Sequence, residues 1–185
     1  MRVLITLDGS EIGESAAAAV AEWALESRAD IVLTMVIHPE DIKQTRSGEY
    51  HHTLTPKGTM GGHLISLEEP QQRMAETREQ ALERARIDAE AYLSKVAEHY
   101  LPGAPAQPVV EWDDDVAGAI VRAADKSDVA FIAMGTHGRT GLGHAILGSV
   151  AEQVVRRAHV PVLVIGPKTR ERLAAASTGD SKASR

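Results

Sequence analysis

The chain has 185 residues, 43% of them hydrophobic and 25% charged, a balance typical of one soluble globular domain. Its formal net charge of −6 argues against a general nucleic-acid or anionic-membrane binder, and the lack of cysteine excludes disulfides, thiolate metal sites and a cysteine nucleophile. The apolar N-terminal run is too short for a signal peptide, and no later stretch reaches the ~18 apolar residues of a membrane span. We therefore expect a cytosolic protein without a membrane partner.

The first part of the chain predicts a strand, a helix and a second strand. Residues 3–7 and 31–37 are short apolar runs rich in β-branched residues, a pattern typical of strands buried on both faces. Between them, apolar residues recur at helical spacing from about 11 to 27, and Ser10 is the expected N-cap. This order predicts a βαβ unit with parallel strands.

Residues 38–69 interrupt the pattern with many glycines and prolines, which predicts a long, irregular and mobile loop. A long amphipathic helix is expected from about 71 to 98. The remaining elements are expected at 108–112 (strand), from 116 (helix, capped within Asp113–Asp115), 129–134 (strand), 149–158 (helix) and 160–165 (strand).

Five strands alternating with four helices predict a doubly wound, Rossmann-like α/β sandwich of three layers around a parallel sheet. We expect one domain over residues 1–166, with the flexible insertion at about 39–69. The tail, 167–185, has no periodicity and is expected to be disordered.

A glycine cluster follows the expected fourth strand, in MGTHGRTGLGHAILGS (134–149). Closely spaced glycines allow backbone N–H groups to converge, and the loop leads into a helix N-terminus, where unpaired amides and the helix dipole attract anions. If the first and fourth strands are neighbours, this loop and Asp8 meet at the point where strand order reverses. The pattern therefore predicts a phosphate site.

Neither common phosphate motif fits the cluster. No Gly-Lys-Ser/Thr occurs, so it is no Walker A loop, and Ile146 stands where the dinucleotide fingerprint needs its third glycine. What remains is Gly-x2-Gly-x9-Gly-Ser over residues 135–149.

This spacing resembles the ATP-binding branch of the universal stress protein family, as do the opening VLITLDGSE and the closing VPVLVI. The resemblance covers roughly residues 1–38 and 70–166. It implies a five-stranded parallel sheet of the adenine nucleotide alpha hydrolase type, usually a homodimer, and ATP as ligand, with Mg²⁺ or Mn²⁺ held through the phosphates.

The resemblance also implies individual contacts. Asp8 would contact the ribose or base, and Val36 would line the adenine pocket. The loop and the start of the following helix would supply the other nucleotide contacts. Met134 would pack near the nucleotide, and the residues near the phosphates would be Gly135, Gly138, Gly148, Ser149 and Val150. His137 and Arg139 lie in the loop and could reach phosphate oxygens.

Structural roles remain open for several of these residues. Ser149 and Glu152 form a capping-box sequence, and Asp8 can cap the first helix or turn without any ligand. The three acids at 113–115 suit either a helix cap or Mg²⁺, with the cap favoured. His51, His52 and His63 lack a metal-binding spacing and are expected at the surface.

Three functions remain open. The first is a cytosolic ATP-binding stress-response or signalling protein that pairs into a homodimer through the apolar edge strand at 161–165. The second is a slow ATPase or autophosphorylating phosphotransferase, although no residue has the spacing of a catalytic base. The third is a nucleotide-free interaction protein that acts through the 39–69 loop and the dimer surface.

Overall fold

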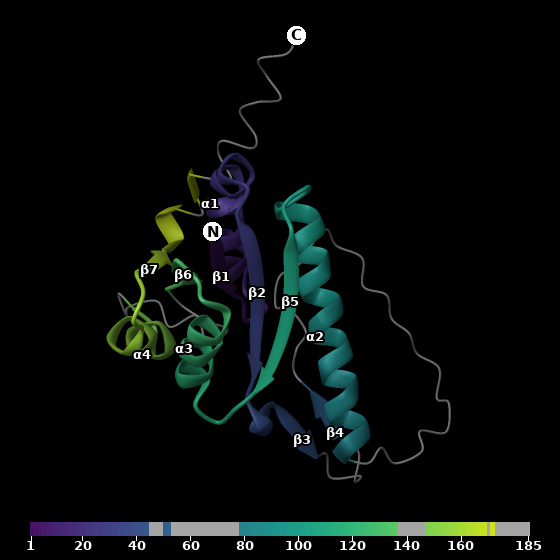
Figure 1. Cartoon of the computed structure of the whole chain (residues 1–185). Coiled ribbons are helices and arrows are strands. Elements are labelled where there is room, and N and C mark those ends of the chain that lie inside the picture. The colour runs from purple at the N-terminus through teal and green to yellow at the C-terminus, as the bar shows by residue number, and fades with distance from the viewer. Residues whose placement is uncertain (45–49, 53–77, 137–146, 170, 173–185) are drawn as a thin grey trace.

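The computed structural model describes residues 1–44, 50–52, 78–136, 147–169 and 171–172 (Figure 1). Its centre is a five-stranded parallel sheet in the order β5-β2-β1-β6-β7. The strands are β1 (Arg2–Thr6), β2 (Asp30–Ile37), β5 (Ala106–Trp112), β6 (Phe131–Gly135) and β7 (Val162–Ile165). The expected fold class is therefore confirmed.

Strand order reverses at β1. From β1 the chain moves outward to β2 and β5, then returns to the other side of β1 for β6 and β7. Thr6 is in register with Thr34 of β2 and with Met134 of β6. The predicted adjacency of the first and fourth strands is confirmed, and the carboxyl ends of β1 and β6 are the switch point at which ligands bind in such sheets.

Helices cover both faces of the sheet (Figure 1). On one face, α1 (Glu11–Ser27) and α2 (Arg78–Tyr100) pack through small residues such as Ala16 and Ala85 against strand residues such as Val3 and Ile5. On the other face lie α3 (Val116–Ser127) and α4 (Ser149–Arg157), and their core contains Leu4, Ile120, Ile132, Met134 and Val154. Because successive strand residues are buried on opposite faces, the central strands β1 and β2 are apolar at most positions.

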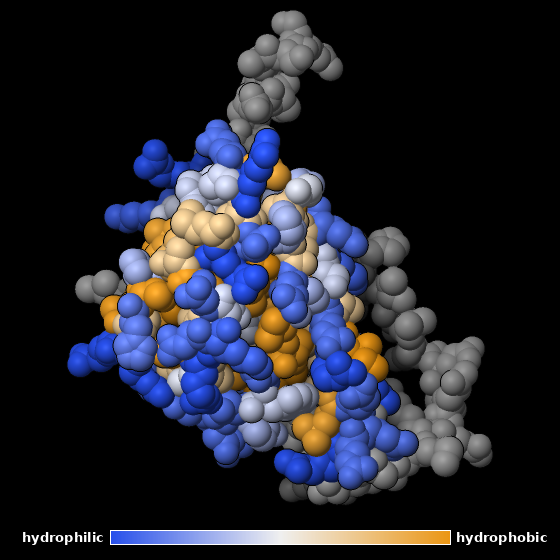
Figure 2. All heavy atoms as spheres, in the orientation of Figure 1, coloured by the Kyte–Doolittle hydropathy of each residue, from blue (hydrophilic) through white to orange (hydrophobic). Residues whose placement is uncertain are grey.

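The face with α3 and α4 is covered incompletely. Val36 and Val109 stay half-buried there although they pack against the core. Figure 2 shows this face in the same view, with apolar surface between polar side chains across the middle of the molecule.

Helix ends follow their local sequence. Ser10 caps α1 by accepting a hydrogen bond from the Gly13 amide, and Asp115 caps α3 by accepting one from Gly118. Both expected caps are confirmed. Two helices end at non-glycine residues in the left-handed region, Arg28 (φ 51°) and Asp128 (φ 50°).

Several expected boundaries are corrected. Within the segment predicted to be wholly irregular, a 3₁₀ turn (Pro39–Asp41) precedes two short antiparallel strands, β3 (Ile42–Gln44) and β4 (Tyr50–His52). Isoleucine and tyrosine favour strands, and β4 lies beside α2, which supports the pair. The other insertion residues and the expected start of α2 at 71 lie outside the described residues; α2 ends at Tyr100, two residues beyond the prediction.

The predicted disorder of the tail is wrong at its beginning. Residues 167–169 and 171–172 are helical, and the Thr169 amide donates to the Gly166 carbonyl across 3.0 Å, which closes a turn. Residues 170 and 173–185 lie outside the described part. None of the helices in the described ranges has the length and apolarity needed to cross a bilayer.

Candidate anion and nucleotide site at the ends of β1 and β6

A tight turn connects β1 to α1. Gly9 adopts φ +80°, a conformation that L side chains rarely adopt, and this turns the chain into the helix. The Asp8 carboxylate folds over the turn, where Oδ1 accepts hydrogen bonds from the Ser10 amide (3.1 Å) and the Ser10 hydroxyl (2.6 Å). Within the described residues, Oδ2 accepts no hydrogen bond. Asp8 therefore shapes the turn through Oδ1, while its Oδ2 has no hydrogen-bond donor among the described residues.

Gly13 gives the Asp8 carboxylate its space, and sequence reasoning missed it. A Cβ on Gly13 would lie 2.7 Å from Asp8 Oδ1 and 3.3 Å from Ser10 Oγ. A glycine inside a helix lowers stability by up to about 1 kcal/mol relative to alanine. The signal in the sequence is therefore the presence of Gly13 in the first turn of a predicted helix, where alanine would be more stable.

Gly135, at the end of β6, packs directly on the first turn of α1. A Cβ there would lie 3.0 Å from Ile12 Cγ2 and 3.1 Å from the Gly13 amide nitrogen. This close strand–helix approach accounts for Gly135 without a ligand. Its predicted approach to a phosphate stays a prediction.

Thr136, the residue after β6, makes backbone hydrogen bonds to the end of β7 and to the residue before α4. Its amide donates to the Ile165 carbonyl (2.8 Å), and its carbonyl accepts from the Gly148 amide (2.6 Å). The start of α4 is thereby attached to the end of β6. The Gly148 amide is used in this contact, so it does not face a ligand. His137, Gly138 and Arg139 lie between the two attachment points and outside the described residues.

The start of α4 differs from the expected capping box. The N-cap is Gly148, with extended backbone angles (φ −70°, ψ 157°) and no side-chain cap, while Ser149 is the first helical residue and is exposed. A capping hydroxyl must belong to the extended residue before the helix, so Ser149 cannot cap. The Glu152 carboxylate instead contacts Arg156 in its own helix.

Among the described residues, the amides of the first turn of α4 have no hydrogen-bond acceptor. The first N–H groups of a helix have no intrahelical acceptor, and the described residues supply none for Ser149, Val150 and Ala151. Three helix N-termini have described cap residues. Those of α1 and α3 already hold side-chain oxygens from Ser10 and Asp115, and α4 alone holds none. Among these three, α4 is therefore the best anion site.

The surroundings of α1 also disfavour an anion there. The Glu14 carboxylate, in the first turn of α1, accepts hydrogen bonds from the hydroxyls of Tyr92 (3.1 Å) and Tyr100 (3.2 Å). Burial raises the pKa of Tyr92 far above its usual value, and the negative charges of Glu14 and Asp8 raise it further. These carboxylates make the α1 side of the switch point negative, which disfavours an anion there.

The predicted apolar contacts lie on the α3/α4 side of the sheet. Met134 is buried and Val36 is half-buried, and both pack against the core of that face. They lie two strands apart, and Val36 is two residues further along its strand, so the two residues are about 12 Å apart at the usual strand spacing and rise. Thr34, fully buried on the same face two residues before Val36, has a hydroxyl without a hydrogen-bond partner in the described part of the chain.

The described residues also form a groove away from this site. A groove of about 380 Å³ lies on the α2 side, against Leu82 and Trp112, away from the ends of β1 and β6. The described histidines and acids include no group of three or more placed to hold a metal ion. Asp115, one of the acids considered for Mg²⁺, is engaged as the cap of α3.

Comparisons with known proteins identify relatives. The universal stress protein family model matches residues 63–166. The universal stress protein MJ0531 of Methanocaldococcus jannaschii is 31% identical over 170 residues, which cover 92% of this chain and 84% of the relative. The solved structure of MJ0577, from the same organism, superimposes with a TM-score of 0.65 at 21% identity over 89% of this chain and 94% of its own.

A second solved structure carries a ligand. The universal stress protein of Archaeoglobus fulgidus, solved in complex with dAMP, superimposes with a TM-score of 0.53 at 18% identity. The superposition covers 89% of this chain and 97% of that protein, so the folds correspond over nearly their whole length.

Proposed function

Because this chain belongs to the universal stress protein family, we propose that it is an adenine-nucleotide-binding protein of stress response or signalling, with ATP as its ligand. The observation that carries the proposal is the uncapped start of α4, where three adjacent amides lack an acceptor among the described residues beside the switch point of the sheet. The dAMP complex of a structural relative supports an adenine nucleotide as the class of ligand.

In the proposed complex, each part of the nucleotide has its own contacts. The phosphates lie against the amides of Ser149 and Val150, where the helix dipole adds to the hydrogen bonds. The ribose binds the Asp8 carboxylate through Oδ2, and the base lies near Val36 and Met134. A divalent metal ion is held through the phosphates rather than by a protein cage.

Calorimetric titration with ATP and with adenosine tests this proposal. We expect wild type to bind ATP more tightly than adenosine, since the amides of α4 contact only the phosphates. Gly148→Val places a branched side chain at the start of α4 and should abolish this difference while adenosine affinity remains. Gly166→Val is the control, because a Cβ there meets no atom closer than Thr136 Cγ2 at 3.8 Å. Equal ATP affinity in wild type and Gly148→Val would contradict the phosphate assignment.

We also propose that two copies pair through β7. In the part of the chain that the structure describes, this strand pairs with β6 on one side only, and Leu163 on the strand and Val155 on α4 are 42% and 45% exposed. An apolar edge strand is a template for pairing with another chain. Sedimentation velocity should show a dimer for wild type and a monomer for Leu163→Lys. Ile87→Lys, at an exposed position on α2, should remain dimeric; a monomeric wild type would refute the pairing.

A further inference from the structure

A short apolar face holds the helix that carries the proposed phosphate site: the half-buried Val150 packs against the core beside Ala151 and Val154, with Leu147 and Ala158 at the two ends of the helix. Of the nine residues of α4, only Ala151 and Val154 are buried. The cap residue, Gly148, contributes no side chain. Polar contacts at the two ends of α4 add to this packing in setting its tilt and rotation.

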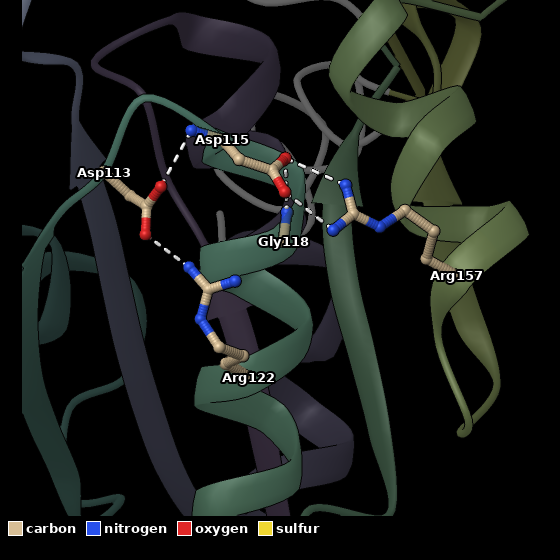
Figure 3. A network of polar contacts seen from close by, with 5 residues as sticks. All are labelled: Asp113, Asp115, Gly118, Arg122 and Arg157. Atoms are coloured by element: carbon tan, nitrogen blue, oxygen red, sulfur yellow. Dashed lines mark hydrogen bonds and ion pairs between the residues drawn. The ribbon is translucent and has the colours of Figure 1, made fainter.

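At the start of α4 the polar contact is the hydrogen bond from the Gly148 amide to the Thr136 carbonyl, and at the other end it is a side-chain contact to α3. The guanidinium of Arg157 donates two parallel hydrogen bonds to Asp115, from Nη1 to Oδ1 (2.8 Å) and from Nη2 to Oδ2 (2.7 Å), as Figure 3 shows. A bidentate contact between planar groups restricts the relative orientation of the two groups as well as the distance between them, which a single ion pair does not. It joins α4 to the first turn of α3.

The carboxylate that receives this contact is itself fixed. Asp115 Oδ1 accepts the Gly118 amide (3.0 Å) as the cap of α3, and the Asp115 amide donates to Asp113 Oδ1 (2.8 Å). Asp113 pairs in turn with Arg122 of α3 (Figure 3). A Cβ on Gly118 would lie 2.2 Å from Asp115 Oδ2 and 2.5 Å from Arg157 Nη2, so glycine there leaves the space in which the two groups meet.

We propose that Arg157 is a positioning residue for nucleotide phosphate binding: its paired hydrogen bonds to Asp115 set the orientation of α4 and thereby the direction of the free amides at Ser149 and Val150. The inference rests on the proposed function. Arg157 lies about 12 Å from Ser149 along the helix axis, at about 1.5 Å per residue, so it acts through the helix rather than by touching the ligand.

The test compares two neighbouring arginines by calorimetric titration with ATP and with adenosine. Arg157→Gln removes the contact to α3. Arg156→Gln removes the same charge from the same turn but only a contact to Glu152 within α4. We expect Arg157→Gln to weaken ATP binding by about 2- to 30-fold, the range of couplings transmitted through side-chain networks, with adenosine affinity unchanged. Equal ATP affinities of the two variants would overturn the inference.

Asp115→Asn provides a second test from the other partner. Asparagine can still cap Gly118, so α3 remains capped while the ion pair is lost. Asp115→Asn should weaken ATP binding as much as Arg157→Gln, and the double variant should lose no more than either single one. Additive losses would overturn the inference. If wild type binds neither ATP nor adenosine, the proposed function fails and the inference with it; if wild type binds ATP and the variants bind it equally well, only the inference fails.

Discussion

Gly135→Ala tests whether the glycine at the end of β6 serves packing or phosphate. The added Cβ would lie 3.0 Å from Ile12 Cγ2 and 3.1 Å from the Gly13 amide nitrogen and the Ile12 carbonyl carbon. Carbon contacts are optimal at about 3.5–4.0 Å, so β6 and α1 would have to separate by several tenths of an ångström. Two of the three atoms are backbone and cannot rotate away. Overpacking of this kind costs about 1–3 kcal/mol.

A matched glycine isolates this steric cost. Gly166→Ala places its Cβ 3.8 Å from Thr136 Cγ2, an ordinary contact. Either replacement reduces the entropy of the unfolded chain, which by itself stabilises by about 0.4–1 kcal/mol. The difference between the two variants in urea-unfolding free energy, measured without nucleotide, should therefore equal the steric cost, about 1–3 kcal/mol.

The result decides between the two roles of Gly135. If Gly135→Ala proves as stable as Gly166→Ala but binds ATP more weakly, the packing argument is wrong and the glycine serves the ligand. A loss of stability with ATP affinity retained assigns it to packing against α1.

Three further predictions concern groups around the site. Thr34→Val should raise the free energy of unfolding in urea by about 1–3 kcal/mol, since a methyl replaces a buried hydroxyl that lacks a partner among the described residues; a loss of stability would show that the hydroxyl is bonded. The Arg157 guanidinium lowers the pKa of Asp115 from 3.8 to about 2. The ionised Asp115 carboxylate therefore contributes to folding stability above pH 4, and this contribution is lost as the pH falls toward 2. Carboxyl NMR titration should show this pKa return toward its ordinary value in Arg157→Gln, and an unchanged pKa would contradict the pairing. Tyr92→Phe removes one of two donors to Glu14 and should destabilise by about 1 kcal/mol in thermal unfolding, whereas no change would mean that solvent replaces the phenol.

The sheet and the helices that cover it were predictable because a strand that is buried on both faces has a simple sequence pattern, a short run of apolar residues. The runs around Ile5, Leu33 and Ile132 are apolar at nearly every position, a pattern typical of a strand between two helical layers. The strand pair at 42–44 and 50–52 was not predictable, because three-residue strands are too short to show alternation.

The contacts around the candidate site differ in how far the sequence predicts them. Asp8 and Ser10 lie in one turn, so their contact follows from neighbouring residues. At the start of α4, however, both Gly148 and Ser149 are common caps, and only the backbone angles decide between them. The contact of Asp115 with Arg157 joins residues 42 positions apart and needs the packing of α3 on α4, which local patterns do not contain.

The most direct test of phosphate binding at the start of α4 is to follow backbone amide resonances by NMR during titration with ATP and, separately, with adenosine. The amides of Ser149, Val150 and Ala151 should shift strongly with ATP and little with adenosine, whereas resonances near Asp8 should shift with both. If ATP binds and these three amides do not move, the phosphates lie elsewhere and the assignment of α4 as the anion site is wrong.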